Sequence, residues 1–282
     1  MRYSIVIPAH NEEAFIGLTL GSVAAQTVLP DQVVVVDDNS VDRTAETVQQ
    51  LALKYNWLSL VNSTSEAVHL PGTKVINAFN KGFERIVPGY DVIVKLDADL
   101  ILPPSYFEAI LNIFKADEKV GMAGGFASIE RNGEWILENL TDKDHIRGAF
   151  KAYRKDCFEN IGGLKPAMGW DTVDELLAKF YGWKVVTVPD LMVKHLKPTG
   201  ANYNKAARYK QGEAFYSLGY GFVITAIASA KLAMMKRKPL LFVDYIRGFL
   251  KAKTTKKPLL VTEDQARFIR KYRFKKIREK LQ

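Results

Sequence analysis

The sequence predicts an α/β protein in which helices flank a mostly parallel sheet, followed by a C-terminal helical appendage. Short apolar runs alternate with amphipathic stretches through the first 100 residues. The run at 32–38 is apolar at consecutive positions, which is typical of a strand covered on both faces, and residues 90–100 contain a further strand-like run. Basic residues concentrate at the C-terminal end. The alternation predicts a three-layer sheet with functional loops at the carboxyl ends of its strands.

The individual elements follow in chain order. We expect strands at residues 3–10, 32–38, 58–62 and 90–100, with helices at 11–26, 39–55 and 73–86. Asn39 and Ser40 are turn or cap candidates for the second helix. Further on, helices at 105–117 and 170–183 and strands at 120–129, 133–140 and 184–196 complete the pattern. The glycines Gly162 and Gly163 predict a tight turn.

Composition places the chain among globular proteins. With 282 residues, 48% of them apolar, it is long enough for a substantial core. The N-terminus lacks the apolar segment of a signal peptide, and the lone Cys157 agrees with a reducing compartment, so we expect a cytoplasmic location. We expect a catalytic domain at residues 1–215, with a nucleotide-binding half at 1–100 and an acceptor-side half at 101–215. A basic, apolar-rich helical extension at 216–282 follows.

The positive charge belongs to this extension. Residues 231–282 hold 17 Lys and Arg against four Asp and Glu, a net charge of +13, which leaves −4 for residues 1–230. A nucleic-acid-binding domain is expected to carry its charge on the folded body, so we expect no specific nucleic acid partner.

Residues 218–230 contain no charged side chain, but at 13 residues they are shorter than the roughly 20 that a bilayer span needs. They form a core helix, a re-entrant segment or an interfacial one. The basic clusters that follow are interleaved with Leu, Phe, Ile and Tyr, a mixture that lies well on an anionic leaflet. The alternative is that these helices pack on the catalytic domain and expose a solvated basic face. We expect residues 216–282 to contact the inner face of the cell membrane.

Two carboxylates end the fourth predicted strand. Asp97 and Asp99, separated by one alanine, repel each other unless a cation lies between them. Oxygen ligands suit Mg²⁺ or Mn²⁺, and the position at a strand's carboxyl end favours a ligand site over a surface turn. Asp38 ends the second strand at the same sheet edge, where it can accept a hydrogen bond from a base or a ribose hydroxyl. It is also placed to belong to a helix-capping cluster.

Four segments together carry a family resemblance: IVIPAHNEEAFI, VVVVDDNSVDRT, GTKVINAFNKGF and VIVKLDADL. In this order and spacing they resemble the nucleotide-sugar glycosyltransferases of family 2, which have the GT-A fold. The resemblance covers about the first 100 residues. It implies that Asp97 and Asp99 coordinate a divalent cation, Mn²⁺ or Mg²⁺, on the diphosphate of a nucleoside diphosphate sugar, with Asp97 also close to the donor. The nucleotide-binding residues that it implies are Pro8, Ala9, Asn11, Glu12, Asp38 and Lys74.

The family also places an acidic residue, usually in a Glu-Asp pair, at a helix start about ten residues before a Gly-aromatic pair. Here Asp171 lies eleven residues before Gly182, and Trp170 replaces the usual glutamate. The resemblance implies that Asp171 is the general base, with Asp174 and Glu175 as rivals one turn on. A carboxylate near a sugar site can take the acceptor's proton, and acidic residues in a first helical turn are also stabilised by the helix dipole.

His195 lies at the end of the last predicted strand. The resemblance implies that it completes the metal site or touches the diphosphate, as a histidine at about this place does in several members of the family. A lone histidine is more often structural, and imidazole suits Mn²⁺ better than Mg²⁺.

We therefore predict a metal-dependent, inverting hexosyltransferase that moves sugar to a hydroxyl of a glycan or lipid-linked glycan, in cell-surface polysaccharide or lipopolysaccharide synthesis. One alternative is a sugar-nucleotide or glycan-binding relative without transfer activity, which the change at Trp170 favours. The other is a nucleotidyltransferase, although PAHNEE lacks the glycine-rich, basic phosphate loop of that class.

Overall fold

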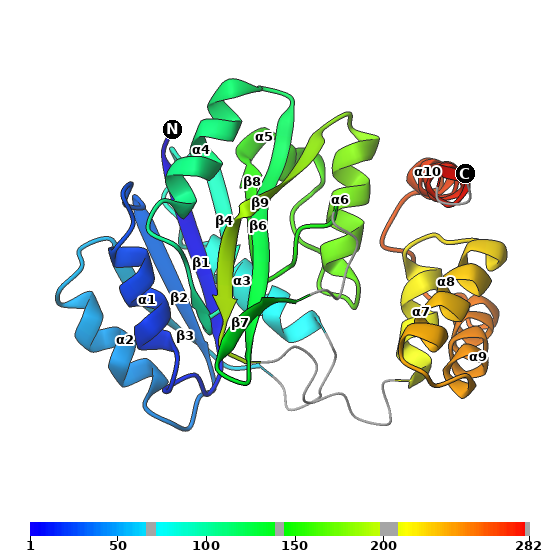
Figure 1. The fold of residues 1–282 in the computed structure, drawn as a ribbon, viewed down its shortest axis with the longest axis horizontal. Helices are drawn as coiled ribbons and strands as arrows, with labels where there is room; N and C mark the ends of the chain where they lie inside the picture. The colour runs from blue at the N-terminus through cyan, green and yellow to red at the C-terminus, as the bar shows by residue number, and fades with distance from the viewer. Residues whose placement is uncertain (66–71, 139–143, 198–207, 280–282) are drawn as a thin grey trace.

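The computed structural model describes residues 1–65, 72–138, 144–197 and 208–279. Figure 1 shows a central twisted sheet with helices on both faces and a group of helices beside it, formed by the C-terminal part of the chain.

The N-terminal half alternates strands and helices as predicted. Its elements are β1 (Tyr3–Ala9), α1 (Ile16–Ala24), β2 (Gln32–Asp38), α2 (Thr44–Ala52), β3 (Leu58–Ser63), α3 (Thr73–Phe83) and β4 (Val92–Leu96). The four strands lie in the order β3-β2-β1-β4 and all pair in parallel.

The valines of β2 show that helices cover this sheet on both faces. Val33 and Val35 belong to the core beneath α1, whereas Val34 and Val36 belong to the core beneath α3. Because successive side chains of a strand point to opposite faces, a strand between two helical layers needs apolar residues at every position. The uninterrupted valine run therefore encodes a central strand.

The second half of the sheet is mixed. Its elements are β5 (Leu100–Ile101), α4 (Tyr106–Ala116), β6 (Val120–Arg131), β7 (Glu134–Leu137), β8 (Phe150–Arg154), α5 (Lys155–Asn160), α6 (Trp170–Phe180) and β9 (Lys184–His195). β8 lies antiparallel between β4 and β6, and β6 pairs in parallel with β9. The strands β3, β2, β1 and β4 are therefore parallel, as predicted, and β6 and β9 form one more parallel pair. β8 and α5 are additions to the predicted elements.

The start of α2 differs from the prediction. Asn39 has a left-handed φ of 59°, as a turn residue, but Ser40 accepts a hydrogen bond from the amide of Asn11 and caps no helix. The amide of Thr44, where α2 begins, donates to Asp42 Oδ1 at 3.0 Å. The N-cap position itself is Arg43, whose side chain makes no capping hydrogen bond.

The C-terminal extension comprises α7 (Arg208–Ser217), α8 (Phe222–Met235), α9 (Leu240–Thr254) and α10 (Glu263–Glu279). α7 crosses α9 so closely that a Cβ added at Gly212 would lie 1.8 Å from the carbonyl oxygen of Tyr245. α10 packs against α6, where the rings of Phe180 and Phe268 meet edge to face at 5.5 Å. The predicted division at residue 215 falls inside α7 and stays a prediction.

Among the helices of the described residues, none combines the length and the apolar character that crossing a membrane requires.

Candidate active site

Two loops at the carboxyl ends of β1 and β2 are tied together. The amide of Asn11 donates to Ser40 Oγ at 2.9 Å, and Asn11 Oδ1 accepts the amide of Val41 at 2.9 Å. His10 Nδ1 lies 2.6 Å from the carbonyl oxygen of Asp38. Asn11 has a φ of 54°, a left-handed conformation that asparagine tolerates better than most residues. These contacts place the predicted segment from Pro8, through the buried Ala9, to Glu12 beside Asp38.

Glu12 connects this loop to the far end of the sheet. Its Oε2 accepts a hydrogen bond of 2.5 Å from Lys197, which follows β9. Burial raises the pKa of Glu12, the Lys197 ammonium opposes this, and the nearby carboxylates of Asp99 and Asp97 raise the pKa further. The structure therefore brings Glu12 into the same electrostatic environment as the Asp97 and Asp99 pair.

Asp38 is buried at the end of β2. Its Oδ1 accepts a hydrogen bond from Ser63 Oγ at 3.3 Å, and Ser63 Oγ in turn accepts one from Lys81 Nζ at 2.7 Å. Lys74 is half-buried in the first turn of α3, the same helix that carries Lys81. The carboxyl ends of β2 and β3 and the helix α3 thus surround one polar region.

Asp99 and His195 meet because β5 pairs with β9. Leu100 is the register partner of His195, and the Asp99 Oδ2 to His195 Nε2 distance is 3.4 Å. His195 Nδ1 lies 3.5 Å from Oε2 of the buried Glu138. Burial alone would lower the pKa of His195, but the carboxylates of Asp99 and Glu138 outweigh it and raise the pKa to about 9.

Asp97 is held differently from Asp99. Its carboxylate forms an ion pair with the buried ammonium of Lys95, two residues before it. Burial raises the pKa of Asp97, and the Asp99 charge adds to this effect while Lys95 opposes it. The structure therefore places the two aspartates together, as predicted, with one of them already paired to a protein cation.

We tested whether these side chains fit a divalent cation. The described residues contain no group of three or more His, Cys, Asp and Glu side chains arranged to hold a metal ion. The Asp99 carboxylate and the His195 imidazole do offer one oxygen and one nitrogen donor side by side, a set that suits Mn²⁺. These two donors fit part of a coordination shell.

The three acidic candidates in the first half of α6 have different surroundings. Asp174 accepts hydrogen bonds from Lys151 Nζ at 3.0 and 3.1 Å and from Tyr153 Oη at 2.7 Å. Glu175 Oε1 lies 3.1 Å from Lys151 Nζ and also accepts a backbone amide. Their side chains are 2% and 6% exposed, whereas that of Asp171 is 36% exposed. Of these three carboxylates, only that of Asp171 has substantial access to a ligand.

His145 lies between two of these carboxylates and was not among the predicted site residues. Its Nε2 lies 3.6 Å from Asp171 Oδ2 and its Nδ1 lies 3.1 Å from Glu175 Oε1. Burial would lower the pKa of His145, but Asp171 and Glu175 raise it to about 9. Burial would raise the pKa of Asp171, but His145 and Lys151 lower it overall. Asp171 is consequently ionised at neutral pH, as a proton acceptor must be.

The donor-side and α6 carboxylates are joined through β4 and β8. Lys95 and Lys151 are register partners on these strands, so their side chains lie on the same face of the sheet. Lys95 pairs with Asp97, and Lys151 Nζ donates to the carbonyl oxygen of Asp171 at 2.5 Å. The ring of Trp170 covers both ammonium groups, with centroid distances of 5.3 and 5.9 Å. One pair of opposed lysines therefore links the two predicted halves of the site.

Sequence reasoning missed His145, Lys151, Glu138 and Lys197. The first three lie in the stretch with the weakest periodicity, and single polar residues there carry no pattern that separates them from surface positions. Lys151 offers the one usable signal, since it interrupts the apolar run of residues 149–153.

Comparison with known proteins identifies the class. The family model described as glycosyl transferase family 2 matches residues 4–165, more than half of the chain. The chain belongs to this family, and its architecture is the GT-A fold that the sequence predicted.

Two curated relatives and one solved structure illustrate the similarity. A dolichol-phosphate mannosyltransferase of Pyrococcus furiosus is 28% identical over 208 residues, which are 67% of this chain and 56% of that protein. An undecaprenyl-phosphate mannosyltransferase of Micrococcus luteus is 29% identical over 202 residues, 66% of this chain and 75% of that protein. The mannosyltransferase PcManGT of Pyrobaculum calidifontis, in complex with GDP-Man and Mn²⁺, superposes with a TM-score of 0.59. It is 18% identical, and the match covers 95% of this chain and 78% of that one. This chain thus spans little more than half the length of the first relative.

Proposed function

We propose that this protein transfers a hexose from a nucleoside diphosphate sugar to a hydroxyl of a glycan or lipid-linked glycan, with inversion at the anomeric carbon. The observation that carries the proposal is the link between the two carboxylate groups through Lys95 and Lys151. This link brings the carboxylates proposed for the donor side and the accessible carboxylate of Asp171 into one region of the fold.

The donor side consists of the two tied loops and α3. Asn11, Glu12 and Asp38, with the backbone at Pro8 and Ala9, are proposed to hold the nucleoside, and Lys74 to approach its phosphates. Asp99 and His195 would hold a divalent cation, Mn²⁺ in preference to Mg²⁺, next to Asp97. When bound, that cation supplies charge neutralisation at the departing diphosphate.

The acceptor side is built on α6. Asp171 accepts the proton of the acceptor hydroxyl while the acceptor oxygen bonds to the anomeric carbon and the bond from that carbon to the diphosphate breaks. His145 and Lys151 keep the Asp171 carboxylate ionised before the transfer. Asp174 and Glu175 are proposed to balance the buried charge of Lys151 and not to act as bases.

The cellular role is proposed on the same basis. Two relatives are named for dolichol phosphate and undecaprenyl phosphate, so hydroxyls of glycans carried on such lipids are the first acceptors to test. Such acceptors place the enzyme at the inner face of the cell membrane, in cell-surface polysaccharide or lipopolysaccharide synthesis.

The test combines donor binding and transfer. Thermal-shift measurements with UDP, GDP, CMP and dTDP, each with and without Mn²⁺, identify the nucleotide, because a ligand of the native state raises its apparent stability. Sugar transfer from the matching donor is then measured for Asp171→Asn, with Asp264→Asn in α10 as an exposed control. We expect the first variant to bind donor and lose transfer, and the control to behave as the unmodified protein.

Three results would contradict the proposal. Normal transfer by Asp171→Asn would remove Asp171 as the base. Donor binding without transfer to any hydroxyl acceptor would favour a sugar-nucleotide-binding relative. Release of pyrophosphate from a nucleoside triphosphate would instead indicate a nucleotidyltransferase.

A further inference from the structure

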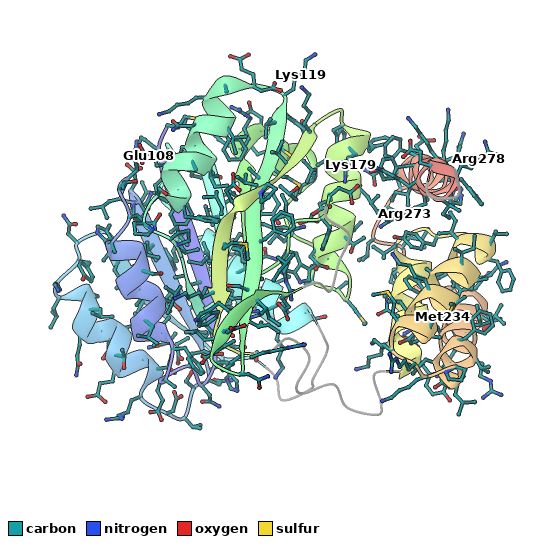
Figure 2. The ribbon with its side chains drawn as sticks, viewed as in Figure 1. Glu108, Lys119, Lys179, Met234, Arg273 and Arg278 are labelled. Carbon is teal, nitrogen blue, oxygen red and sulfur yellow. The ribbon has the colours of Figure 1, made fainter. Side chains whose placement is uncertain are left out.

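The turn between α8 and α9 exposes large apolar side chains next to basic ones. Met234 is 78% exposed and Leu240 is 75% exposed, and Arg237 and Lys238 lie between them in sequence. We call residues 231–243 the α8–α9 tip. Figure 2 labels Met234 on the helical extension.

The tip is an ordered structure. Arg237 has a left-handed φ of 52°, its amide donates to the carbonyl of Met234, and the amide of Lys238 donates to the carbonyl of Ala233. These two hydrogen bonds form the Schellman arrangement that closes a helix end. The exposed methionine and leucine are therefore displayed by a fixed backbone.

The exposed apolar surface continues along both helices. The described residues include 21 large apolar side chains classed as exposed, and nine of them lie within residues 222–250. Such a concentration on a tenth of the chain marks a contact surface. The nine are Phe222, Val223, Ile227, Met234, Met235, Leu240, Phe242, Val243 and Leu250. At the tip itself, Ala230, Ala233, Met234, Pro239 and Phe242 line an open groove together with Arg237 and Lys238.

The charge of the α8–α9 tip has one sign. Residues 231–243 contain four basic side chains and no Asp or Glu, and the one acidic residue of 222–250 is Asp244, directly after the tip. A second copy of this chain is a poor occupant, because a two-fold contact would bring the same basic side chains together. An anionic lipid surface satisfies both properties at once, since its acyl chains accept the apolar side chains and its phosphates accept the cations.

We propose that the α8–α9 tip is a peripheral contact with an anionic phospholipid bilayer. Met234 and Leu240 enter the boundary between headgroups and acyl chains, while Arg237 and Lys238 bind lipid phosphates. The 14 residues of α8 extend about 21 Å, which is shorter than a hydrocarbon core of about 30 Å, so the helix lies on the bilayer and does not span it. The contact uses none of the active-site residues, and its test requires neither donor nor acceptor.

The test is co-sedimentation of the full chain with vesicles of phosphatidylcholine, alone or mixed with phosphatidylglycerol. We expect binding to the mixed vesicles that weakens as salt increases. Arg237→Asn with Lys238→Gln should weaken binding to the mixed vesicles about tenfold or more. Each of the two basic residues is expected to strengthen binding to an anionic surface by up to about tenfold. Asparagine is chosen at position 237 because it tolerates the left-handed backbone.

Matched control variants distinguish an effect of the tip from a general effect of net charge or of exposed apolar side chains on vesicle binding. Lys115→Gln with Lys119→Gln removes the same charge from exposed positions of the catalytic domain, where Figure 2 labels Lys119. Met234→Asp with Leu240→Asp is compared with Val41→Asp and Leu53→Asp, which lie at exposed positions on the N-terminal half. We expect both tip variants to weaken vesicle binding about tenfold or more, and the controls to retain it within about twofold. Unchanged circular dichroism shows that the tip variants are folded.

The proposal would be overturned if the unmodified chain bound neutral and anionic vesicles equally, or bound neither. It would also be overturned if tip and control variants lost binding equally, or if the chain were a dimer that the tip variants convert to monomer. Tighter binding to non-specific DNA than to anionic vesicles would also overturn it.

Discussion

Lys95 and Lys151 are two buried lysines that lie directly opposite each other on adjacent antiparallel strands. Like charges in such a pair repel, and neither side chain is more than 2% exposed. Each ammonium is matched by its own carboxylate, Asp97 for Lys95 and Asp174 for Lys151. The pair is therefore stable only as part of a larger charge network.

Lys151→Met should destabilise the fold strongly. The substitution leaves Asp174 buried without its cation, and breaking a buried ion pair from one side costs about 3–5 kcal/mol. Urea denaturation measures the loss. Lys184→Met is the matched control, because Lys184 pairs with Asp117 at the surface. The urea midpoint of this variant should not shift measurably from that of the unmodified protein. Equal midpoints for the two variants would contradict this account of the network.

His145→Gln should destabilise the protein more at pH 6 than at pH 9.5. The pKa of His145 is about 9 in the folded protein, above the 6.5 of an unperturbed histidine. A raised histidine pKa contributes stability that is complete below the unfolded value and is lost as the pH rises from 6.5 through about 9. The free energy of unfolding of both proteins at the two pH values checks this. An equal difference at both would mean that the pKa of His145 is not raised.

Gly82→Ala should destabilise the protein although alanine is the better helix former. An added Cβ would lie 2.5 Å from Val6 Cγ1 and 2.6 Å from Val36 Cγ2, so α3 would have to move off the sheet at a cost of about 1–3 kcal/mol. Gly21→Ala, also within a helix, meets nothing within 4 Å and should instead stabilise by about 0.5–1 kcal/mol. Thermal unfolding of the two variants should therefore shift in opposite directions.

His195→Gln should weaken donor binding only when Mn²⁺ is present. If the imidazole is a ligand to the cation on the diphosphate, its loss should raise the Kd for the nucleotide about tenfold or more in Mn²⁺, and little in chelator. Calorimetric titration under both conditions measures this. A similar weakening in chelator would show that His195 supports the donor site without binding the metal.

The regular half of the fold could be predicted from the sequence because its signals are periodic. The valine run of β2 and the amphipathic pattern of the neighbouring helices predict where the strands and helices lie. The positions of Asp38 and Asp99 at the sheet edge follow, because each residue comes at the end of a predicted strand. β8 could not be predicted in this way. Its second residue, Lys151, is charged, and a charged residue inside a strand indicates an exposed face unless its buried partners are known.

The candidate base shows the same limit. Spacing favoured Asp171 but left Asp174 and Glu175 open, since all three belong to one acidic helix start. The distinction depends on partners far away in sequence, namely Lys151, Tyr153 and His145. Local pattern contains no information about which carboxylate those residues bind.

Trp170 has a consequence for how this chain relates to other members of its family. The family resemblance predicts glutamate at this position, and a Cβ added at Gly148 would lie 2.6 Å from Trp170 Cζ2. The tryptophan and the glycine thus depend on each other, and the ring also covers Lys95 and Lys151. A smaller residue at position 170 would remove this contact, although Asp171 Cβ would still lie 3.1 Å from the added atom. We expect positions 95, 148, 151 and 170 to covary among related chains, because the ring of Trp170 contacts the other three residues.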